Sequence, residues 1–82
     1  MNSDVVVFTA PGCRSCERAK AFLKAHGVTF VERNLADDGA AMEELAAIGA
    51  RMLPVLRIGN EIISGFDPVR LSDRLGLVTE KA

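Results

Sequence analysis

Short β-branched runs alternate with amphipathic stretches along the chain. Val5–Thr9 is a continuous β-branched and aromatic run, which predicts a central strand covered on both faces. Val28–Asn34 alternates instead, with Val28 and Phe30 set against Thr29, and this predicts a second strand. Because a helical stretch separates the two strands, we expect them to pair in parallel through a right-handed crossover.

The stretch from about Cys13 to His26 has the spacing of an amphipathic helix. Four side chains recur on one face of it: Cys16, Ala19, Phe22 and Leu23. Lys20 and Lys24 lie on another side, and Gly27 follows in the position that glycine favours at a helix end. This segment therefore predicts the helix that links the first two strands.

Two later segments also predict helices. Asp37 or Asp38 can cap the earlier one, which runs to about Ile48. Its buried stripe is expected to consist of Met42, Leu45 and Ala46. Asp67-Pro68 opens the later helix with a cap residue and a proline at the first helical position, and Gly76 closes it.

Between these two helices the pattern is that of a β-hairpin. After a sharp break at Leu53-Pro54, two short apolar runs, Val55–Ile58 and Glu61–Ser64, are joined through Gly59-Asn60. The element order is therefore β-α-β-α-β-β-α. It predicts an α/β fold, with a four-stranded mixed sheet flanked by three helices.

Composition and charge restrict the function classes. The 82 residues are expected to form one domain, 1–82, and 49% of them are apolar. The formal net charge of −1 gives no electrostatic reason to expect nucleic acid or an acidic membrane as a partner. The first four residues lack the basic region of a signal peptide, and Val5–Phe8 is too short to span a membrane. We therefore expect a cytoplasmic location, where two cysteines rarely make a structural disulfide.

The segment Cys13-Arg14-Ser15-Cys16 carries the candidate chemistry. Cysteines three apart on a helical turn can close and reopen a disulfide with little backbone movement. Cys13 follows a strand and a Pro-Gly turn, so it falls at a helix N-terminus, where N–H groups and the helix dipole stabilise a thiolate. Arg14 and Arg18 add positive charge. We therefore expect the pKa of Cys13 to be lowered, and Cys16 to be the resolving thiol.

Two other interpretations of this cysteine pair stay open from the residues alone. The pair can be structural, because a bare C-x-x-C segment also occurs by chance. It can also bind zinc, but a closed structural site needs four ligands, and the chain offers only Cys13, Cys16 and His26. His26 itself is expected to be solvated at the end of the first helix.

Three segments together resemble the glutaredoxins, a branch of the thioredoxin-fold family: residues 8–16, residues 52–55 and residues 64–67. The likeness covers nearly the whole chain and implies a thioredoxin-like fold, with Cys13 attacking and Cys16 resolving. It also implies that Pro54 is a cis-proline facing the dithiol. The substrate-binding residues that it implies are Arg14, Ser15, Leu53, Pro54, Gly65, Phe66 and Asp67. From the sequence alone, Pro54 can also be a trans turn proline, Phe66 a core residue and Asp67 a helix cap.

The chain departs from glutathione-dependent glutaredoxins near the cysteines. Those proteins usually carry C-P-Y-C with a lysine shortly before it, whereas this chain has Arg14-Ser15 and Ala10. The Gly65-Phe66 pair is similar to the NrdH-redoxins, which thioredoxin reductase reduces. The resemblance therefore implies no bound cofactor and an external electron donor, either glutathione or NADPH-dependent thioredoxin reductase. The implied partners are disulfide-containing proteins, with ribonucleotide reductase among the candidates, and the chain is expected to be a monomer.

Thiol–disulfide exchange is the function that these observations favour. The resemblance implies an electron donor that reduces protein or small-molecule disulfides, with no metal site of its own. One alternative is an iron–sulfur cluster-binding module, since some glutaredoxins hold a cluster between two chains with the first cysteine and glutathione. Another is a redox-inert adaptor that borrows the fold, which the retention of both Cys13 and Cys16 disfavours.

Overall fold

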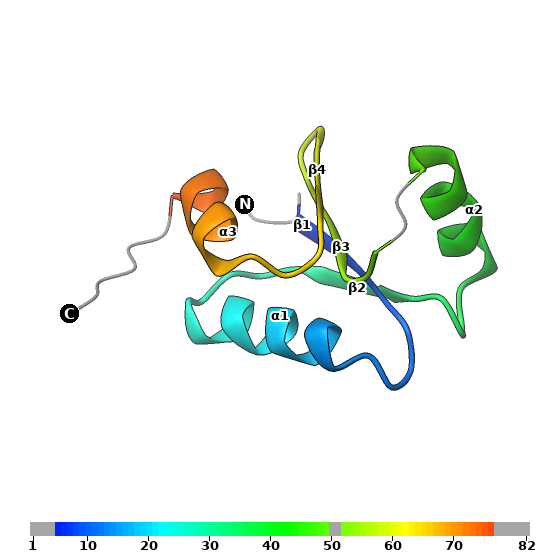
Figure 1. The fold of residues 1–82 in the computed structure, drawn as a ribbon, viewed down its shortest axis with the longest axis horizontal. Helices are drawn as coiled ribbons and strands as arrows, with labels where there is room; N and C mark the ends of the chain where they lie inside the picture. Colours follow the sequence, from blue (N-terminus) through cyan, green and yellow to red (C-terminus); the bar gives the residue numbers. More distant parts are fainter. Residues whose placement is uncertain (1–4, 50–51, 77–82) are drawn as a thin grey trace.

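Seven secondary-structure elements follow one another in the predicted order (Figure 1). The computed structural model describes residues 5–49 and 52–76. The elements are β1 (Val5–Thr9), α1 (Arg14–Ala25), β2 (Val31–Asn34), α2 (Gly39–Ile48), β3 (Val55–Ile58), β4 (Glu61–Ser64) and α3 (Pro68–Leu75). None of the helices in these ranges is long and apolar enough to cross a lipid bilayer.

The strands form one mixed sheet in the order β2-β1-β3-β4. β1 pairs in parallel with β2 and antiparallel with β3, and β3 pairs antiparallel with β4. β1 and β4 therefore run in the same direction, so the turns that follow them leave the same end of the sheet. All five residues of β1 are buried, which is the pattern expected for a strand covered on both faces.

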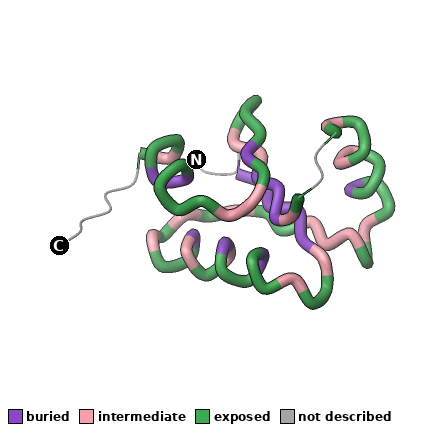
Figure 2. Tube along the Cα trace, in the orientation of Figure 1, coloured by how far each residue is buried: buried purple, intermediate pink, exposed green. Residues whose placement is uncertain are grey.

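Helices cover both faces of the sheet (Figure 1). On the face against α1 and α3, the buried cluster consists of Val5, Val7, Leu23, Leu56, Ile63 and Leu71. On the face against α2, the smaller cluster consists of Val6, Phe8, Ala41 and Val55. Figure 2 shows α2 largely exposed, and Ala41 is its one buried residue. The larger core therefore lies on the side of the sheet that α1 covers.

The cap of α2 is Asp38 rather than Asp37. The Asp38 carboxylate accepts a hydrogen bond from the backbone amide of Ala41 at 3.0 Å, which satisfies one of the free N–H groups at the helix start. Gly49 ends the helix in the left-handed conformation, with φ of 80°, where a residue without a Cβ atom is favoured.

Two expectations about the second strand and the second helix were wrong. β2 begins at Val31 rather than Val28, although Val28 and Phe30 are partly buried against the larger core as predicted. The Met42 side chain is 54% exposed, and Ala46 is exposed as well. The reason is that α2 meets the sheet through Ala41 and Leu45, one turn apart, so Met42 and Ala46 lie off the buried face. Leu45 packs against the smaller core as predicted.

The expectation of a solvated His26 was also wrong, because the residue is partly buried. Its ring Nδ1 lies 3.0 Å from the carbonyl oxygen of Phe22, and its ring lies 4.4 Å from the Phe22 ring, centroid to centroid. The side chain is therefore partly buried at the end of α1, where it satisfies a backbone carbonyl of the last turn.

Candidate active site

Cys13 is the residue that caps α1. The chain leaves β1, turns through residues 10–12, and the Cys13 amide donates a hydrogen bond to the Ala10 carbonyl at 3.3 Å. Cys13 has extended backbone angles, as N-cap residues do, and its Sγ accepts a hydrogen bond from the Cys16 amide at 3.1 Å. The Cys13 sulfur therefore stands where the N–H groups and the dipole of α1 favour negative charge.

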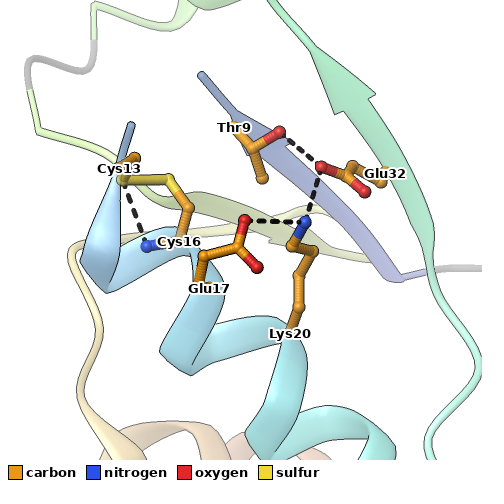
Figure 3. The surroundings of a disulfide bond; sticks show 6 residues. All are labelled: Thr9, Cys13, Cys16, Glu17, Lys20 and Glu32. Carbon is orange, nitrogen blue, oxygen red and sulfur yellow. Dashed lines mark hydrogen bonds and ion pairs between the residues drawn. A yellow bond between two sulfur atoms is a disulfide. The ribbon is translucent and has the colours of Figure 1, made fainter. Parts of the chain in front are cut away.

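Cys13 and Cys16 form a disulfide bond, and their Cα atoms are 5.2 Å apart (Figure 3). The two sulfurs differ in access. Cys13 is only partly buried, whereas Cys16 faces the sheet from the first turn of α1 and is 0% exposed. The structure thus brings the two cysteines together, with one of them open to a partner and the other enclosed.

The turn residues Leu53, Pro54 and Gly65 lie at the same end of the sheet as the cysteines. In the sheet register Phe8 is opposite Val55, and Val55 is opposite Ser64. Pro54 is buried, and its carbonyl accepts a hydrogen bond from the Gly65 amide at 2.8 Å. The Leu53–Pro54 peptide bond is cis, as the resemblance implied. These three residues therefore border the sheet end from which the chain runs into Cys13.

Phe66 and Asp67 are held by structural contacts of their own. Phe66 is partly buried and meets the Phe22 ring edge-on, with centroids 5.8 Å apart. The Asp67 carboxylate accepts hydrogen bonds from the Val69 and Arg70 amides, each at 3.2 Å, and so caps α3. Each thus has the core or capping contact that the sequence analysis left open, and a role in substrate binding stays a prediction.

Arg14 and Ser15, the two residues between the cysteines, are both exposed in the first turn of α1. Both residues therefore contact solvent directly after Cys13 in the chain, and their role in substrate binding stays a prediction.

A polar network near the disulfide had no counterpart in the sequence analysis (Figure 3). The hydroxyl of Thr9, itself 1% exposed, donates to Glu32 at 2.8 Å. Lys20 joins the same carboxylate at 3.0 Å and pairs with Glu17 at 3.2 Å. The hydrogen bonds from Thr9 and then Lys20 lower the pKa of Glu32, and the bond to Glu32 raises that of Lys20. No sequence pattern signals this network, because Thr9 is the single polar residue of β1 and Glu32 is one of three consecutive polar residues in β2.

Comparison with known proteins identifies the family to which the sequence is similar. A glutaredoxin family model matches residues 5–63. A glutaredoxin-like 8.6 kDa protein from the rubredoxin operon of Clostridium pasteurianum is 31% identical over 68 residues, which is 82% of this chain and 91% of that protein.

Two solved structures show the same architecture. A crystallised mutant of the thioredoxin-like protein BC3987 has a TM-score of 0.86 at 28% identity, and the match covers 90% of this chain and 96% of that one. The NrdH-redoxin of Escherichia coli, a glutaredoxin-like protein with a thioredoxin-like activity profile, has a TM-score of 0.79 at 32% identity, covering 87% and 92%. These likenesses confirm the predicted thioredoxin-like class.

Glutaredoxins are thiol–disulfide oxidoreductases, and this chain has the C-x-x-C pair that such exchange uses. The matched family model, the four-stranded mixed sheet with its three helices, and the cysteine pair at the start of α1 agree with one another. By sequence and by fold, the chain belongs to the glutaredoxin family.

Proposed function

We propose that this protein reduces disulfides in proteins or small molecules through its dithiol, with Cys13 attacking and Cys16 resolving. The observation that carries this proposal is the hydrogen bond from the Cys16 amide to Cys13 Sγ, 3.1 Å long, at the N-terminus of α1. A donor of this kind favours an anionic sulfur over a neutral thiol, and so does the helix dipole. The thiolate is the nucleophile in disulfide exchange.

The unequal burial of the two sulfurs supports the division of labour. A substrate disulfide is bulky, so its sulfur reaches Cys13, which is partly exposed, before it reaches Cys16, which is fully enclosed. Cys16 needs no access from solvent because its target is the neighbouring Cys13 sulfur. The 5.2 Å separation of the Cα atoms is within the usual range for a disulfide, so the second step requires little backbone movement.

The proposed reaction has two displacements and transfers two electrons. The Cys13 thiolate attacks one sulfur of the substrate disulfide, forms a mixed disulfide and releases the other sulfur as a thiolate, which takes up a proton. Cys16 then loses its proton and attacks Cys13 Sγ, which releases the second substrate sulfur as a thiol. The substrate is reduced, and the Cys13–Cys16 disulfide is formed. Two electrons and two protons from an external donor restore the dithiol.

We propose an NADPH-dependent thioredoxin-reductase-type flavoprotein as that donor, and the cytoplasm as the compartment. Glutathione has two carboxylates and an ammonium group, so its binding needs placed charges. Ala10 stands where the resemblance leads us to expect a cation for one carboxylate. The NrdH-redoxin of Escherichia coli, which has a thioredoxin-like activity profile, is one of the similar structures. Ribonucleotide reductase is accordingly one disulfide-containing protein to test as a substrate.

Steady-state reduction of a small disulfide tests the choice of donor. NADPH is supplied with thioredoxin reductase in one assay, and with glutathione and glutathione reductase in another. We expect turnover with thioredoxin reductase. Turnover with glutathione and glutathione reductase alone would show that the proposed flavoprotein donor is wrong. The Arg14→Ala variant would then test whether Arg14 supplies the cation that Ala10 lacks, because its loss should raise the KM for glutathione.

Serine variants test the roles of the two cysteines. Cys13→Ser is expected to abolish exchange, because it removes the attacking sulfur. Cys16→Ser is expected to accumulate a mixed disulfide with the substrate on Cys13, since nothing resolves it, and mass spectrometry of the unreduced protein detects this adduct. Exchange by Cys13→Ser at the wild-type rate would disprove the assignment.

A further inference from the structure

Two arginines stand on the outer side of α1, directly beyond the cysteines. Arg14 and Arg18 are both exposed and are four residues apart, so they lie on one ridge of the helix, which continues to Phe22. Neither arginine forms an ion pair with any carboxylate in residues 5–49 or 52–76. The two guanidinium groups are therefore available to a partner that approaches Cys13.

The stability of the fold does not account for these two charges. Positive charge near a helix N-terminus opposes the helix dipole, and Arg14 is the first residue of α1. Other cations of the described chain have a structural reason: Lys20, Arg33, Arg57 and Arg74 form ion pairs, and Lys24 lies in the last turn of α1, where the dipole favours it. A charge that opposes the helix dipole and forms no stabilising contact in the fold points to a role in function.

Arg70 is a third cation of the same kind. It is exposed in the first turn of α3, and it forms no ion pair with the carboxylates of the described residues. α1 begins after the turn that follows β1, whereas the chain crosses from the end of β4 toward the later half of α1 before α3 begins (Figure 1). The edge-on contact between Phe22 and Phe66, 5.8 Å between centroids, joins the chain just before α3 to the later half of α1, one turn beyond Arg18. We call Arg14, Arg18 and Arg70 the basic rim.

Apolar side chains lie beside the basic rim. Met52 is 56% exposed, and its sulfur lies 4.0 Å from the point where a Cβ atom on Gly65 would stand. Val69, next to Arg70 on α3, is 78% exposed. The exposed residues of these segments therefore include Met52, Val69 and the three arginines, together with the carboxylates of Glu17 and Asp67, whereas the whole chain has a net charge of −1.

We propose that the basic rim selects protein disulfides whose cysteines are flanked by carboxylate side chains. This inference rests on the proposed function and names the substrate class of the same dithiol. Guanidinium groups bind carboxylates in two-pronged geometry, and complementary charge raises the rate of encounter. Glutamate or aspartate next to the substrate cysteine would therefore be drawn to Arg14 and Arg18 as its sulfur reaches Cys13.

Three peptide disulfides that differ only in flanking charge test this proposal. Each has one central cysteine in a disulfide, flanked by Glu, Gln or Lys, and kcat/KM is measured for the wild-type protein. We expect the Glu peptide to exceed the Gln peptide by roughly fivefold and the Lys peptide to be the slowest. In about 1 M salt, where the screening length falls to about 3 Å, the three values should converge.

Variants of the arginines test whether the basic rim causes the preference for the Glu peptide. In the Arg14→Gln/Arg18→Gln protein the ratio of the Glu to the Gln peptide should fall to about one, and Arg70→Gln should lower it partially. Lys24→Gln is the matched control, because Lys24 is an exposed cation on another side and at the far end of the same helix. It should leave the ratio at the wild-type value. Circular dichroism confirms that each variant is folded.

Three results would overturn the inference. One is an equal kcat/KM for all three peptides in the wild-type protein. Another is an equal slowing of all three peptides by the double variant, in parallel with slower alkylation of Cys13 by neutral iodoacetamide. The arginines would then act on the thiolate and not on the substrate. Arginine-dependent preference for glutathione disulfide with none among the peptides would also contradict it. Failure to reduce any disulfide would instead refute the proposed function itself.

Discussion

Cys13 occupies a helix position that Ser, Thr, Asp and Asn usually fill. Its Sγ accepts the Cys16 amide hydrogen bond in the closed disulfide, and in the reduced protein the same amide would donate to a thiolate. Capping the helix and activating the nucleophile are therefore one interaction. This interaction is the reason why we assign the attacking role to Cys13, the first cysteine of the pair.

Glu32 provides a test of the polar network beside the cysteines. The Thr9 and Lys20 hydrogen bonds hold its folded-state pKa below the ordinary value of 4.5. This interaction therefore stabilises the fold above pH 4.5, and the contribution is lost as the pH falls through the lowered pKa. We expect Glu32→Gln to lower the free energy of unfolding by about 1 kcal/mol at pH 7. In urea unfolding at pH 3, its difference from wild type should shrink toward zero.

The matched control is Glu43→Gln, because Glu43 is exposed on α2 and forms no ion pair with the described residues. It should unfold with wild type at both pH values. If Glu32→Gln has the same deficit at pH 3 as at pH 7, the ionised carboxylate is not the source of the stabilisation.

At the scale of the elements, α2 meets the sheet through a small apolar contact and a set of ion pairs. Ala41 is its one buried residue, whereas Arg33 of β2 binds both Asp38 at 3.0 Å and Glu44 at 2.7 Å. The Arg33 guanidinium also lies 5.7 Å from the centroid of the Phe8 ring. Arg57 of β3 adds a second contact to Glu44 at 3.3 Å. α2 precedes the Leu53-Pro54 turn in the chain, so we expect its contact with the sheet to influence the position of that turn beside the cysteines.

Arg33→Gln should loosen α2 locally. Because the substitution removes both ion pairs to the helix, we expect the α2 amides to exchange with deuterium roughly fivefold faster, while the α1 amides stay protected. Arg74→Gln is the matched control, since it breaks an ion pair between α3 and Glu61 instead. Unchanged α2 exchange in Arg33→Gln would mean that its apolar contacts suffice.

At the scale of the whole molecule, one sheet serves two cores of unequal size. Adjacent isoleucines on β4 show the division: Ile63 is 1% exposed in the larger core, and Ile62 is 36% exposed on the opposite side of the strand. A chain of this size has a free energy of unfolding of about 5–10 kcal/mol. A few truncations in the larger core would therefore remove most of it.

The two isoleucines make a matched pair of truncations. Ile63→Ala should lower the free energy of unfolding by about 2–4 kcal/mol, because it leaves a cavity between α1, α3 and the sheet. Ile62→Ala should cost about 1 kcal/mol or less. Denaturant titration measures both, and equal losses would contradict the assignment of the buried face.

Local signals in the sequence predict the elements whose formation depends on residues close together in the chain. The strand, turn and helix start around Cys13 and the Asp67-Pro68 cap depend on neighbours in the chain, and both formed as expected. The buried face of α2 depends on how the helix meets a distant sheet, so the prediction of Met42 failed. The Thr9–Glu32 bond joins residues 23 apart, and no local pattern indicates such a partner.

Competitive alkylation of the reduced protein tests the central claim most directly. With a small amount of iodoacetamide near pH 6, the thiol with the larger thiolate fraction and the better access reacts first, and peptide mass spectrometry locates the label. We expect Cys13 to be modified well before Cys16, since Cys13 caps α1 and is partly exposed, whereas Cys16 is fully buried. Equal labelling, or labelling of Cys16 first, would contradict it.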